Sequence, residues 1–204
     1  MNGIETFLLQ LNLSWFLSKL LPYLLFPVMG IIVGVLVVKY FSIRSKFKRI
    51  ILFILFPVSS FGAYFAYSPI YQGDFSNNST ELMMDDVYTD IGENKLTVIS
   101  IPNCPYCFGA MKKMLILKDR NPSLQIEFIV CSSDSLALKW YKENSKDRIS
   151  VVLANEPKVL AKLADFAFPA YVIKEGNDKL IKWRNNDFGV RALDQVESIL
   201  KKNN

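Results

Sequence analysis

The sequence predicts an α/β domain, a central mixed sheet flanked by helices, preceded by a two-helix membrane anchor. Two observations lead to this prediction. Residues 20–38 and 50–67 are long apolar runs without charge, and residues 93–204 alternate strand-like with helix-like segments. The halves also differ in charge. Residues 1–92 hold six of the 24 Lys and Arg and six of the 19 Asp and Glu, so residues 93–204 carry the net charge of +5.

The two apolar runs are long enough to cross a membrane. Nineteen uncharged residues occupy 20–38 and 24 occupy 50–73, of which 50–67 are densely apolar. A bilayer core about 30 Å thick needs about 20 residues per helix. We therefore predict a membrane anchor over residues 1–68. The alternative, two buried helices of a soluble protein, is disfavoured because too little chain remains to cover so much apolar surface.

Basic residues predict the orientation of these spans. The connecting loop holds Lys39, Arg44, Lys46, Lys48 and Arg49. The segment after the second span, 69–92, is acidic, contains no Lys or Arg, and is predicted to be a flexible linker. By the positive-inside rule the loop is cytoplasmic, and both termini and the domain over 93–204 lie outside. A domain that faces the cytoplasm is the alternative.

Two further features of the anchor carry predictions. Residues 4–17 place apolar side chains at helical spacing and predict a helix at the outer membrane interface. Gly30 and Gly34 form a small-xxx-small pair, which allows close helix approach. We favour packing of the hairpin on itself over homodimerisation through these glycines.

The segment over 93–204 is predicted to be one α/β layer domain. The expected strands are 95–101, 124–131, 150–153, 168–173 and 179–183, and the expected helices are 108–118, 133–146, 156–166 and 192–201. The last two strands read as a hairpin around the turn at 175–178.

A Cys-x-x-Cys motif, Cys104-Pro105-Tyr106-Cys107, lies where the first strand of this domain meets the first helix. The amide groups and dipole at a helix N-terminus stabilise a thiolate, the species that thiol–disulfide exchange requires. A spacing of three brings the second sulfur within reach, so a mixed disulfide can be resolved internally. The motif therefore predicts redox chemistry at Cys104 and Cys107.

Other uses of these cysteines fit less well. A structural disulfide over two intervening residues would add little stability. No metal site is predicted, because the chain has no histidine and three cysteines are too few for a four-thiolate zinc site. The third cysteine, Cys131, is either a further redox thiol or, as we favour, a small buried apolar residue. The basic residues form no stripe, so no nucleic-acid partner is expected.

From about residue 94 to 201 the chain resembles the thioredoxin superfamily, in the order strand, Cys-Pro-Tyr-Cys, helix, strand, helix, then Phe168-Pro169 opening a hairpin strand. The resemblance implies that Pro169 is cis and faces the disulfide. It also implies that Phe168 and Pro169, with Pro105 and Tyr106, form the substrate-binding surface. The additional strand and helix over 150–166 look like the insertion of membrane-tethered TlpA/ResA-type proteins.

The resemblance implies a membrane-tethered thiol–disulfide oxidoreductase of the bacterial inner membrane, with Cys104 as an exposed nucleophile and Cys107 as the resolving thiol. Its substrates would be cysteine-containing exported proteins, and it would act as a reductant. No organic cofactor is required, because the dithiol is the redox group, and a membrane redox partner would recycle it. The alternative is a non-catalytic, membrane-anchored module that binds peptides or proteins.

The sequence departs from the family in two respects. Val98 lies six residues before Cys104, and no acid in the first strand takes the place of the buried carboxylate of many thioredoxins. Glu127 is a candidate proton acceptor for Cys107, although a solvated strand charge is the simpler interpretation. The Gly-Gly-x-x-Asp glutathione-binding signature of glutaredoxins is missing after Pro169.

Overall fold

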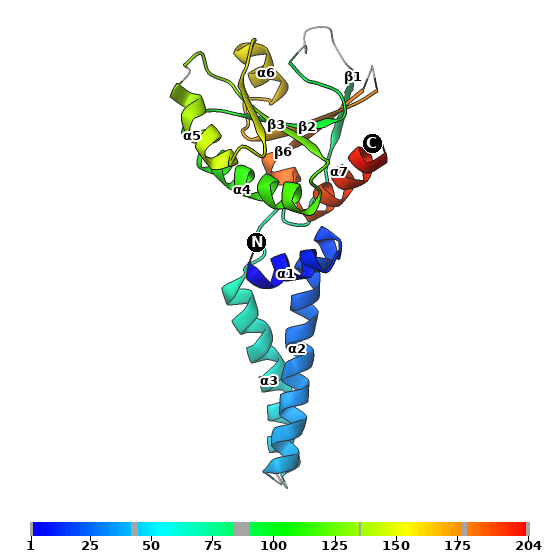
Figure 1. Cartoon of the computed structure of the whole chain (residues 1–204). Helices are drawn as coiled ribbons and strands as arrows, with labels where there is room; N and C mark the ends of the chain where they lie inside the picture. Colours follow the sequence, from blue (N-terminus) through cyan, green and yellow to red (C-terminus); the bar gives the residue numbers. More distant parts are fainter. Residues whose placement is uncertain (1, 42–44, 84–89, 135, 177–178, 203–204) are drawn as a thin grey trace. The chain divides into compact units, whose positions relative to one another are not determined.

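The computed structural model describes residues 2–41, 45–83, 90–134, 136–176 and 179–202. The chain divides into two compact units, Met1–Tyr71 and Gln72–Asn204 (Figure 1). The first contains helices α1 (Gly3–Gln10), α2 (Trp15–Tyr40) and α3 (Lys46–Tyr67). Arg44 of the predicted basic loop lies outside the described residues.

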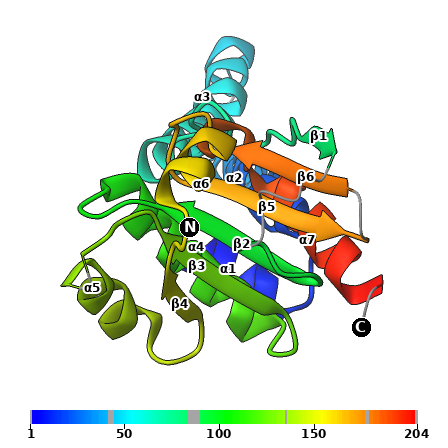
Figure 2. The same cartoon turned by 90° about the horizontal axis from the view of Figure 1, so that it is seen from above.

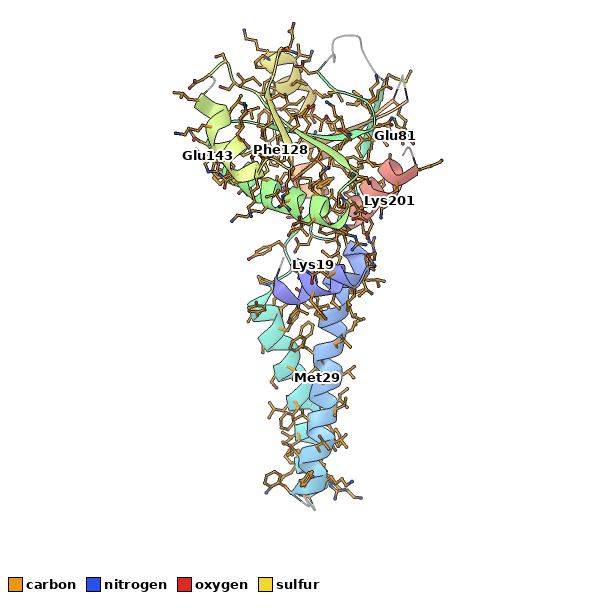
Figure 3. The ribbon with its side chains drawn as sticks, viewed as in Figure 1. Lys19, Met29, Glu81, Phe128, Glu143 and Lys201 are labelled. Atoms are coloured by element: carbon orange, nitrogen blue, oxygen red, sulfur yellow. A yellow bond between two sulfur atoms is a disulfide. The ribbon has the colours of Figure 1, made fainter. Side chains whose placement is uncertain are left out.

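Helices α2 and α3 are long and apolar enough to cross a membrane. Their 26 and 22 residues correspond to lengths of about 39 and 33 Å at 1.5 Å per residue. Large apolar side chains such as Leu24, Val28 and Ile54 are 56%, 51% and 60% exposed, and Met29 is similarly exposed (Figure 3). Contiguous apolar surface of this extent is rare on soluble proteins, which favours lipid as its environment.

The glycine pair of α2 lies against α3. A methyl group added at Gly30 would come within 2.6 Å of the Phe56 carbonyl oxygen and 2.7 Å of the Pro57 Cα. Gly34 lies near the Phe56 ring, which a methyl group there would approach at 3.6 Å. These glycines therefore pack the hairpin on itself, as we predicted, because a side chain at Gly30 would push the two backbones apart.

We expect Gly30→Ala to destabilise this hairpin, because the added methyl overlaps backbone atoms that cannot rotate away. Overpacking of this kind costs about 1–3 kcal/mol. Gly62→Ala is the matched control, since its methyl group would meet no described atom within 4 Å. The measurement is loss of helical circular dichroism during titration of the detergent-solubilised chain with sodium dodecyl sulfate. Equal midpoints for the two variants would contradict the packing of Gly30.

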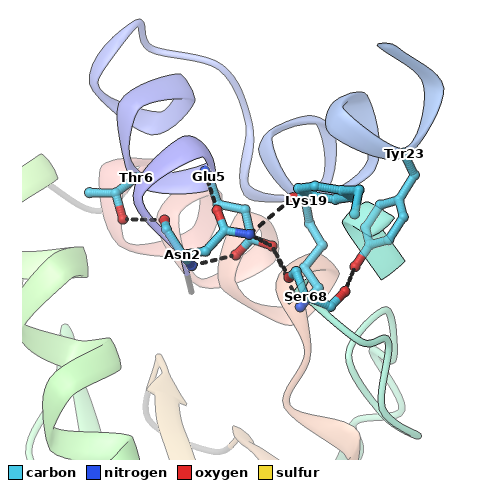
Figure 4. Close-up of polar contacts among 7 residues, drawn as sticks. Asn2, Glu5, Thr6, Lys19, Tyr23 and Ser68 are labelled. Carbon is cyan, nitrogen blue, oxygen red and sulfur yellow. Dashed lines mark hydrogen bonds and ion pairs between the residues drawn. The ribbon is translucent and has the colours of Figure 1, made fainter. Parts of the chain in front are cut away.

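Helix α1 is held at its start by a polar cluster (Figure 4). The Asn2 side chain accepts a hydrogen bond from the Glu5 amide at 2.9 Å, and the Glu5 carboxylate accepts one from the Asn2 amide at 3.2 Å. The buried Glu5 carboxylate also accepts a hydrogen bond from the Ser68 hydroxyl at 3.2 Å and lies 3.9 Å from the Lys19 ammonium. The cluster therefore connects α1 to α2 and to the end of α3.

The predicted helix over 4–17 is in fact two helices. Helix α1 ends at Gln10, Asn12 has a φ of 62°, and Ser14 caps α2 by accepting a hydrogen bond from the Leu17 amide at 3.1 Å. A left-handed residue interrupts a right-handed helix, so the helical backbone does not continue from α1 into α2. Helix α2 therefore begins five residues before the predicted span.

The second unit contains one six-stranded mixed sheet with the order β1-β6-β5-β2-β3-β4 (Figure 2). Strands β2, β3 and β4 are parallel, and the β2–β5, β5–β6 and β6–β1 pairs are antiparallel. The strands are β1 (Thr80–Met83), β2 (Lys95–Ser100), β3 (Gln125–Val130), β4 (Ser150–Leu153), β5 (Ala170–Glu175) and β6 (Lys179–Arg184). In the predicted turn at 175–178, residues 177 and 178 lie outside the described residues.

Helices cover both faces of this sheet. Helices α4 and α7 cover one face, α6 covers the other, and α5 lies beside the outer strand β4 (Figures 1 and 2). The helices are α4 (Pro105–Arg120), α5 (Leu136–Ser145), α6 (Pro157–Leu163), η1 (Asn185–Asp187) and α7 (Val190–Lys202). The predicted α/β class is confirmed: a central mixed sheet flanked by helices follows two apolar helices that could span a membrane.

The predicted linker over 69–92 is wrong in part, because strand β1 lies within it. Thr80 pairs with Lys182 of β6, which makes β1 the edge strand of the sheet, and the Glu81 carboxylate lies 2.9 Å from the Lys179 ammonium. Ile91 is buried in the core. A four-residue edge strand lacks the long β-branched run on which our strand predictions depended, and its stability comes from pairing with β6. Residues 84–89 lie outside the described residues.

Candidate functional site

The two cysteines of the motif lie at the start of α4, as predicted. Strand β2 ends at Ser100, and Cys104 is the N-cap of α4 with Pro105 at the first helical position. Asn103 has a φ of 56°, a left-handed conformation that Asn adopts more readily than most residues, and it turns the chain into the helix. Cys104 and Cys107 form a disulfide with a Cα–Cα distance of 5.2 Å.

The local electrostatics favour negative charge on Cys104. Its Sγ accepts a hydrogen bond from the Cys107 backbone amide at 3.2 Å. The helix that follows is 16 residues long, which is enough for a full helix dipole. Its last turn carries Lys118 and Arg120, whose positive charges compensate the negative end of that dipole. When the disulfide is reduced, the same amide hydrogen bond and the positive end of the dipole stabilise a thiolate at Cys104.

The two sulfur-bearing residues differ in exposure. Cys107 has no exposed surface, whereas Cys104 is 7% exposed and is flanked by exposed Pro105 and Tyr106. Cys104 is therefore buried in the disulfide form, and our prediction of an exposed Cys104 is wrong for this form, because its sulfur turns toward Cys107 and the first turn of α4. Of the two cysteines, Cys104 is the more accessible to an incoming sulfur atom.

A tyrosine from α5 supports the loop that leads into the motif. The buried Tyr141 hydroxyl donates a hydrogen bond to the Ile101 carbonyl at 2.8 Å. The centroid of its ring lies 6.2 Å from that of Phe108 and 6.0 Å from that of Phe128 in the sheet. This contact, 40 residues away in sequence, fixes the backbone three residues before Cys104, and nothing in the local pattern around Tyr141 indicated it.

The predicted substrate-binding residues come partly together. The Phe168–Pro169 peptide bond is cis, and Phe168 is half-buried while Pro169 is buried. Tyr106 and Phe168 line one cleft of about 500 Å³, whose other lining residues are Ala167, Arg184, Asn185, Asn186 and Asp187. Pro105 and Pro169 do not line it. The wall from Arg184 to Asp187 was not identified from the sequence, because it lies at the end of β6 and in η1, far along the chain from the motif.

A second cleft, of about 260 Å³, lies on the other side of the motif. It is lined by Pro102, Asn103, Phe108, Ser132, Asp134, Leu136, Trp140 and Tyr141. Tyr106 and Phe108 are two residues apart on a helix with 100° per residue, so they project to nearly opposite sides and line different clefts. Residues of the motif and its flanks therefore line two clefts, although neither Cys104 nor Cys107 lines either of them.

Cys131 is a free thiol after the end of β3, and no described side-chain contact joins it to Cys104 or Cys107. It is half-buried and packs against the apolar cluster on the α6 face, which includes Ile129 and Leu160. The disulfide opens α4, which covers the opposite face of the sheet (Figure 1). The interpretation of Cys131 as a third redox thiol is therefore not supported by its position, and burial of its side chain is partial rather than complete.

We expect Cys131 to alkylate slowly. Burial, with a smaller contribution from the charge of Asp90, raises the pKa of its thiol to about 11, so the neutral form dominates below that pH. At pH 8 the thiolate fraction is about 100-fold below that of a thiol with a pKa of 9. Cys131 is the only thiol in the oxidised chain, so iodoacetamide incorporation reports on it alone. The rate should rise about tenfold per pH unit between pH 8 and 10, and incorporation at pH 8 as fast as in the urea-denatured chain would contradict the burial.

Glu127 is not placed to accept the proton of Cys107. Its carboxylate forms an ion pair with Lys95, the first residue of β2, whereas the disulfide follows the last residue of that strand. The Ser150 hydroxyl donates a further hydrogen bond to it at 3.3 Å. In β3, Glu127 also shares its face with Ile129 of the α6-side cluster, opposite to α4. Glu127 is therefore a charged residue of the sheet surface, the simpler of our two interpretations.

Within the described ranges, no three His, Cys, Asp or Glu side chains come together in a group that could hold a metal ion. The chemistry that the site offers therefore resides in the sulfur atoms of Cys104 and Cys107, the helix N-terminus and the two clefts.

Part of the chain is similar to a solved protein structure. No described protein family matches the chain, and no curated protein matches it. A solved structure of a secreted Mycobacterium tuberculosis disulfide oxidoreductase, homologous to E. coli DsbE, is similar to part of it. The identity is 16% and the TM-score 0.38, over 54% of this chain and 83% of that one. At this level we transfer no activity from that protein.

Proposed function

We propose that the protein is a membrane-tethered thiol–disulfide oxidoreductase that acts on cysteine-containing proteins outside the cytoplasmic membrane. The observation that carries the proposal is the asymmetry of the disulfide. Cys104 caps α4, accepts the Cys107 amide hydrogen bond and retains some exposure, while Cys107 is fully buried one turn further on. This arrangement gives one sulfur for attack and another for release.

The proposed exchange starts from the reduced pair. The Cys104 thiolate attacks one sulfur of a substrate disulfide, so a Cys104–substrate bond forms and the other substrate sulfur leaves as a thiolate. Cys107, deprotonated, then attacks the Cys104 sulfur, which releases the second substrate thiolate and forms the Cys104–Cys107 disulfide. Two electrons pass to the substrate, whose thiolates take up two protons, and no organic cofactor takes part.

We propose reduction as the physiological direction, following the resemblance to TlpA/ResA-type proteins. A membrane dithiol partner would then return two electrons to the Cys104–Cys107 disulfide after each cycle. Both termini and the second unit would lie on the periplasmic side of the bacterial inner membrane, because the loop between α2 and α3 is the basic one. The substrates would be exported proteins that carry disulfides.

Turnover of a protein disulfide tests the proposal. We expect the full chain, purified in detergent, to accelerate the reduction of insulin by dithiothreitol, as measured by the turbidity of the released B chain. The reaction requires only a reactive dithiol and an accessible polypeptide disulfide. Insulin reduction at the rate of dithiothreitol alone would contradict the proposed activity and favour the alternative of a non-catalytic binding module.

A further inference from the structure

The loop between α6 and β5 carries Phe168 and Pro169, and its backbone is unusual. Asp165 and Phe166 have φ values of 50° and 55°, so two consecutive residues other than glycine are left-handed. Such conformations are disfavoured for residues with a Cβ and persist where surrounding contacts hold them. Backbone hydrogen bonds to the end of α6, such as the one from the Phe166 amide to the Ala161 carbonyl at 2.9 Å, hold the turn itself. The Phe166 side chain is exposed, so the side chain that ties this loop to the sheet is that of Asp165.

Asp165 is bound by two cations of strand β6. Its Oδ2 accepts hydrogen bonds from the Lys182 ammonium at 2.8 Å and from Nε and Nη2 of Arg184 at 3.1 and 2.9 Å. Lys182 is only 6% exposed, and its ammonium also donates to the Leu163 carbonyl at 3.0 Å, at the end of α6. A buried ammonium requires a paired carboxylate, so this contact is costly to break.

The ion pair connects the loop to the first cleft. Ala167 and Phe168, two and three residues after Asp165, line that cleft, and so does Arg184. Lys182 and Arg184 are two residues apart on β6 and therefore point to the same face, toward α6 and this loop. One carboxylate thus fixes two separate walls of the cleft beside Tyr106.

We propose that Asp165 is a positioning residue for the substrate polypeptide: it holds Phe168 and Arg184 in the arrangement that receives the chain next to the attacked disulfide. The inference rests on the proposed function of Cys104 and Cys107. Asp165 touches neither cysteine in any described contact, so it acts through the cleft walls and not on the reacting sulfur atoms.

This role predicts a separation of kinetic effects. Asp165→Asn keeps the shape of the side chain but removes the charge that binds Lys182 and Arg184. The tie between the loop and β6 is weakened, so Phe168 and Arg184 are no longer held in fixed positions on the cleft. Binding of a polypeptide substrate weakens, while the reaction of the disulfide with a small thiol is unchanged. Substrate misplacement of this kind raises KM with little change in kcat.

The test uses the full chain in detergent, with insulin as the polypeptide disulfide and dithiothreitol as the small reductant. For Asp165→Asn we expect KM for insulin to rise at least about fivefold, while kcat and the rate of reduction of the Cys104–Cys107 disulfide by dithiothreitol stay within about twofold. Asp119→Asn is the matched control. Asp119 forms an ion pair with Arg148 away from both clefts, so all three quantities should equal those of the unsubstituted chain.

Arg184→Gln separates positioning from a loss of folding. The Arg184 side chain is 60% exposed, so its replacement leaves intact the Lys182–Asp165 pair, in which the Lys182 side chain is 7% and the Asp165 side chain 39% exposed. Arg184→Gln should also raise KM for insulin. In the double variant with Asp165→Asn, KM should rise by less than the product of the two single fold increases, because both substitutions break the same Asp165–Arg184 contact. If Asp165→Asn does not fold, Arg184→Gln alone tests the inference: a raised KM for insulin supports it, and an unchanged KM overturns it.

The outcomes distinguish the inference from the proposed function. An unsubstituted chain that reduces insulin, together with unchanged KM in the folded variants, would overturn the role of Asp165 and leave the activity standing. An equal fall in kcat and in the dithiothreitol rate would also overturn it, because the effect would then act on the disulfide itself. If the unsubstituted chain does not reduce insulin, the proposed function is contradicted, and the inference about Asp165 falls with it.

Discussion

Replacement of Cys104 by serine should reduce insulin turnover to the rate of dithiothreitol alone. A serine hydroxyl is not ionised at neutral pH and forms no disulfide, so neither the attack nor the mixed disulfide is available. Cys107 cannot take over, because it has no exposed surface. The measurement is the insulin turbidity assay, with retention of helical circular dichroism as the check on folding.

Cys107→Ser should have a different consequence at the same site. Cys104 still attacks, but no second thiol releases the captured chain, so turnover falls and a disulfide-linked adduct with the substrate accumulates. A mass increase on a non-reducing gel, lost on reduction, detects it. The chain with both substitutions retains Cys131 and should form no adduct. An adduct in that control, or full turnover in either single variant, would contradict the assigned roles.

The sequence was sufficient for the parts of the fold that have strong local patterns. The β-branched run that forms β2, the long apolar helices α2 and α3, and the motif at the start of α4 are each visible within a short window. The order of the strands in the sheet was not predicted, apart from the hairpin of β5 and β6. The helix starts were less accurate: α4 begins three residues earlier than predicted, since Cys104 itself is the N-cap.

Features that depend on distant contacts were missed. Strand β1 exists because β6 offers an open edge, and the sequence of Thr80–Met83 alone does not indicate it. The Tyr141 hydrogen bond to Ile101 and the Asp165 contacts with β6 join residues 17 to 40 positions apart. No periodicity encodes such polar pairs, so only the folded chain reveals which carboxylate and which hydroxyl support the site.

Glu127 and Cys131 show a related limit. Both are on β3 or directly after it, and alternation along a strand gives two faces without saying which one α4 covers. The packing of α6 against Ile129 assigns both residues to the side away from the disulfide. A one-residue difference in register would have reversed that assignment.

A second prediction with a large expected effect concerns how readily the Cys104 thiol loses its proton in the reduced chain. The Cys107 amide hydrogen bond and the positive end of a 16-residue helix both favour the thiolate over the thiol. We therefore expect the reduced site to react with an alkylating reagent at pH 6 much faster than an ordinary cysteine, by tenfold for each pH unit that its pKa is lowered.

The alkylation rate of Cys104 as a function of pH is the most direct measurement of this account. It is made on the full chain carrying Cys107→Ser and Cys131→Ala, so that a single thiol reacts, with the same chain in urea as the control. The account predicts a titration midpoint below about pH 7 in the folded chain and near about 8.5 in urea. A folded midpoint equal to that in urea would contradict it, because the start of α4 would then not stabilise the attacking sulfur.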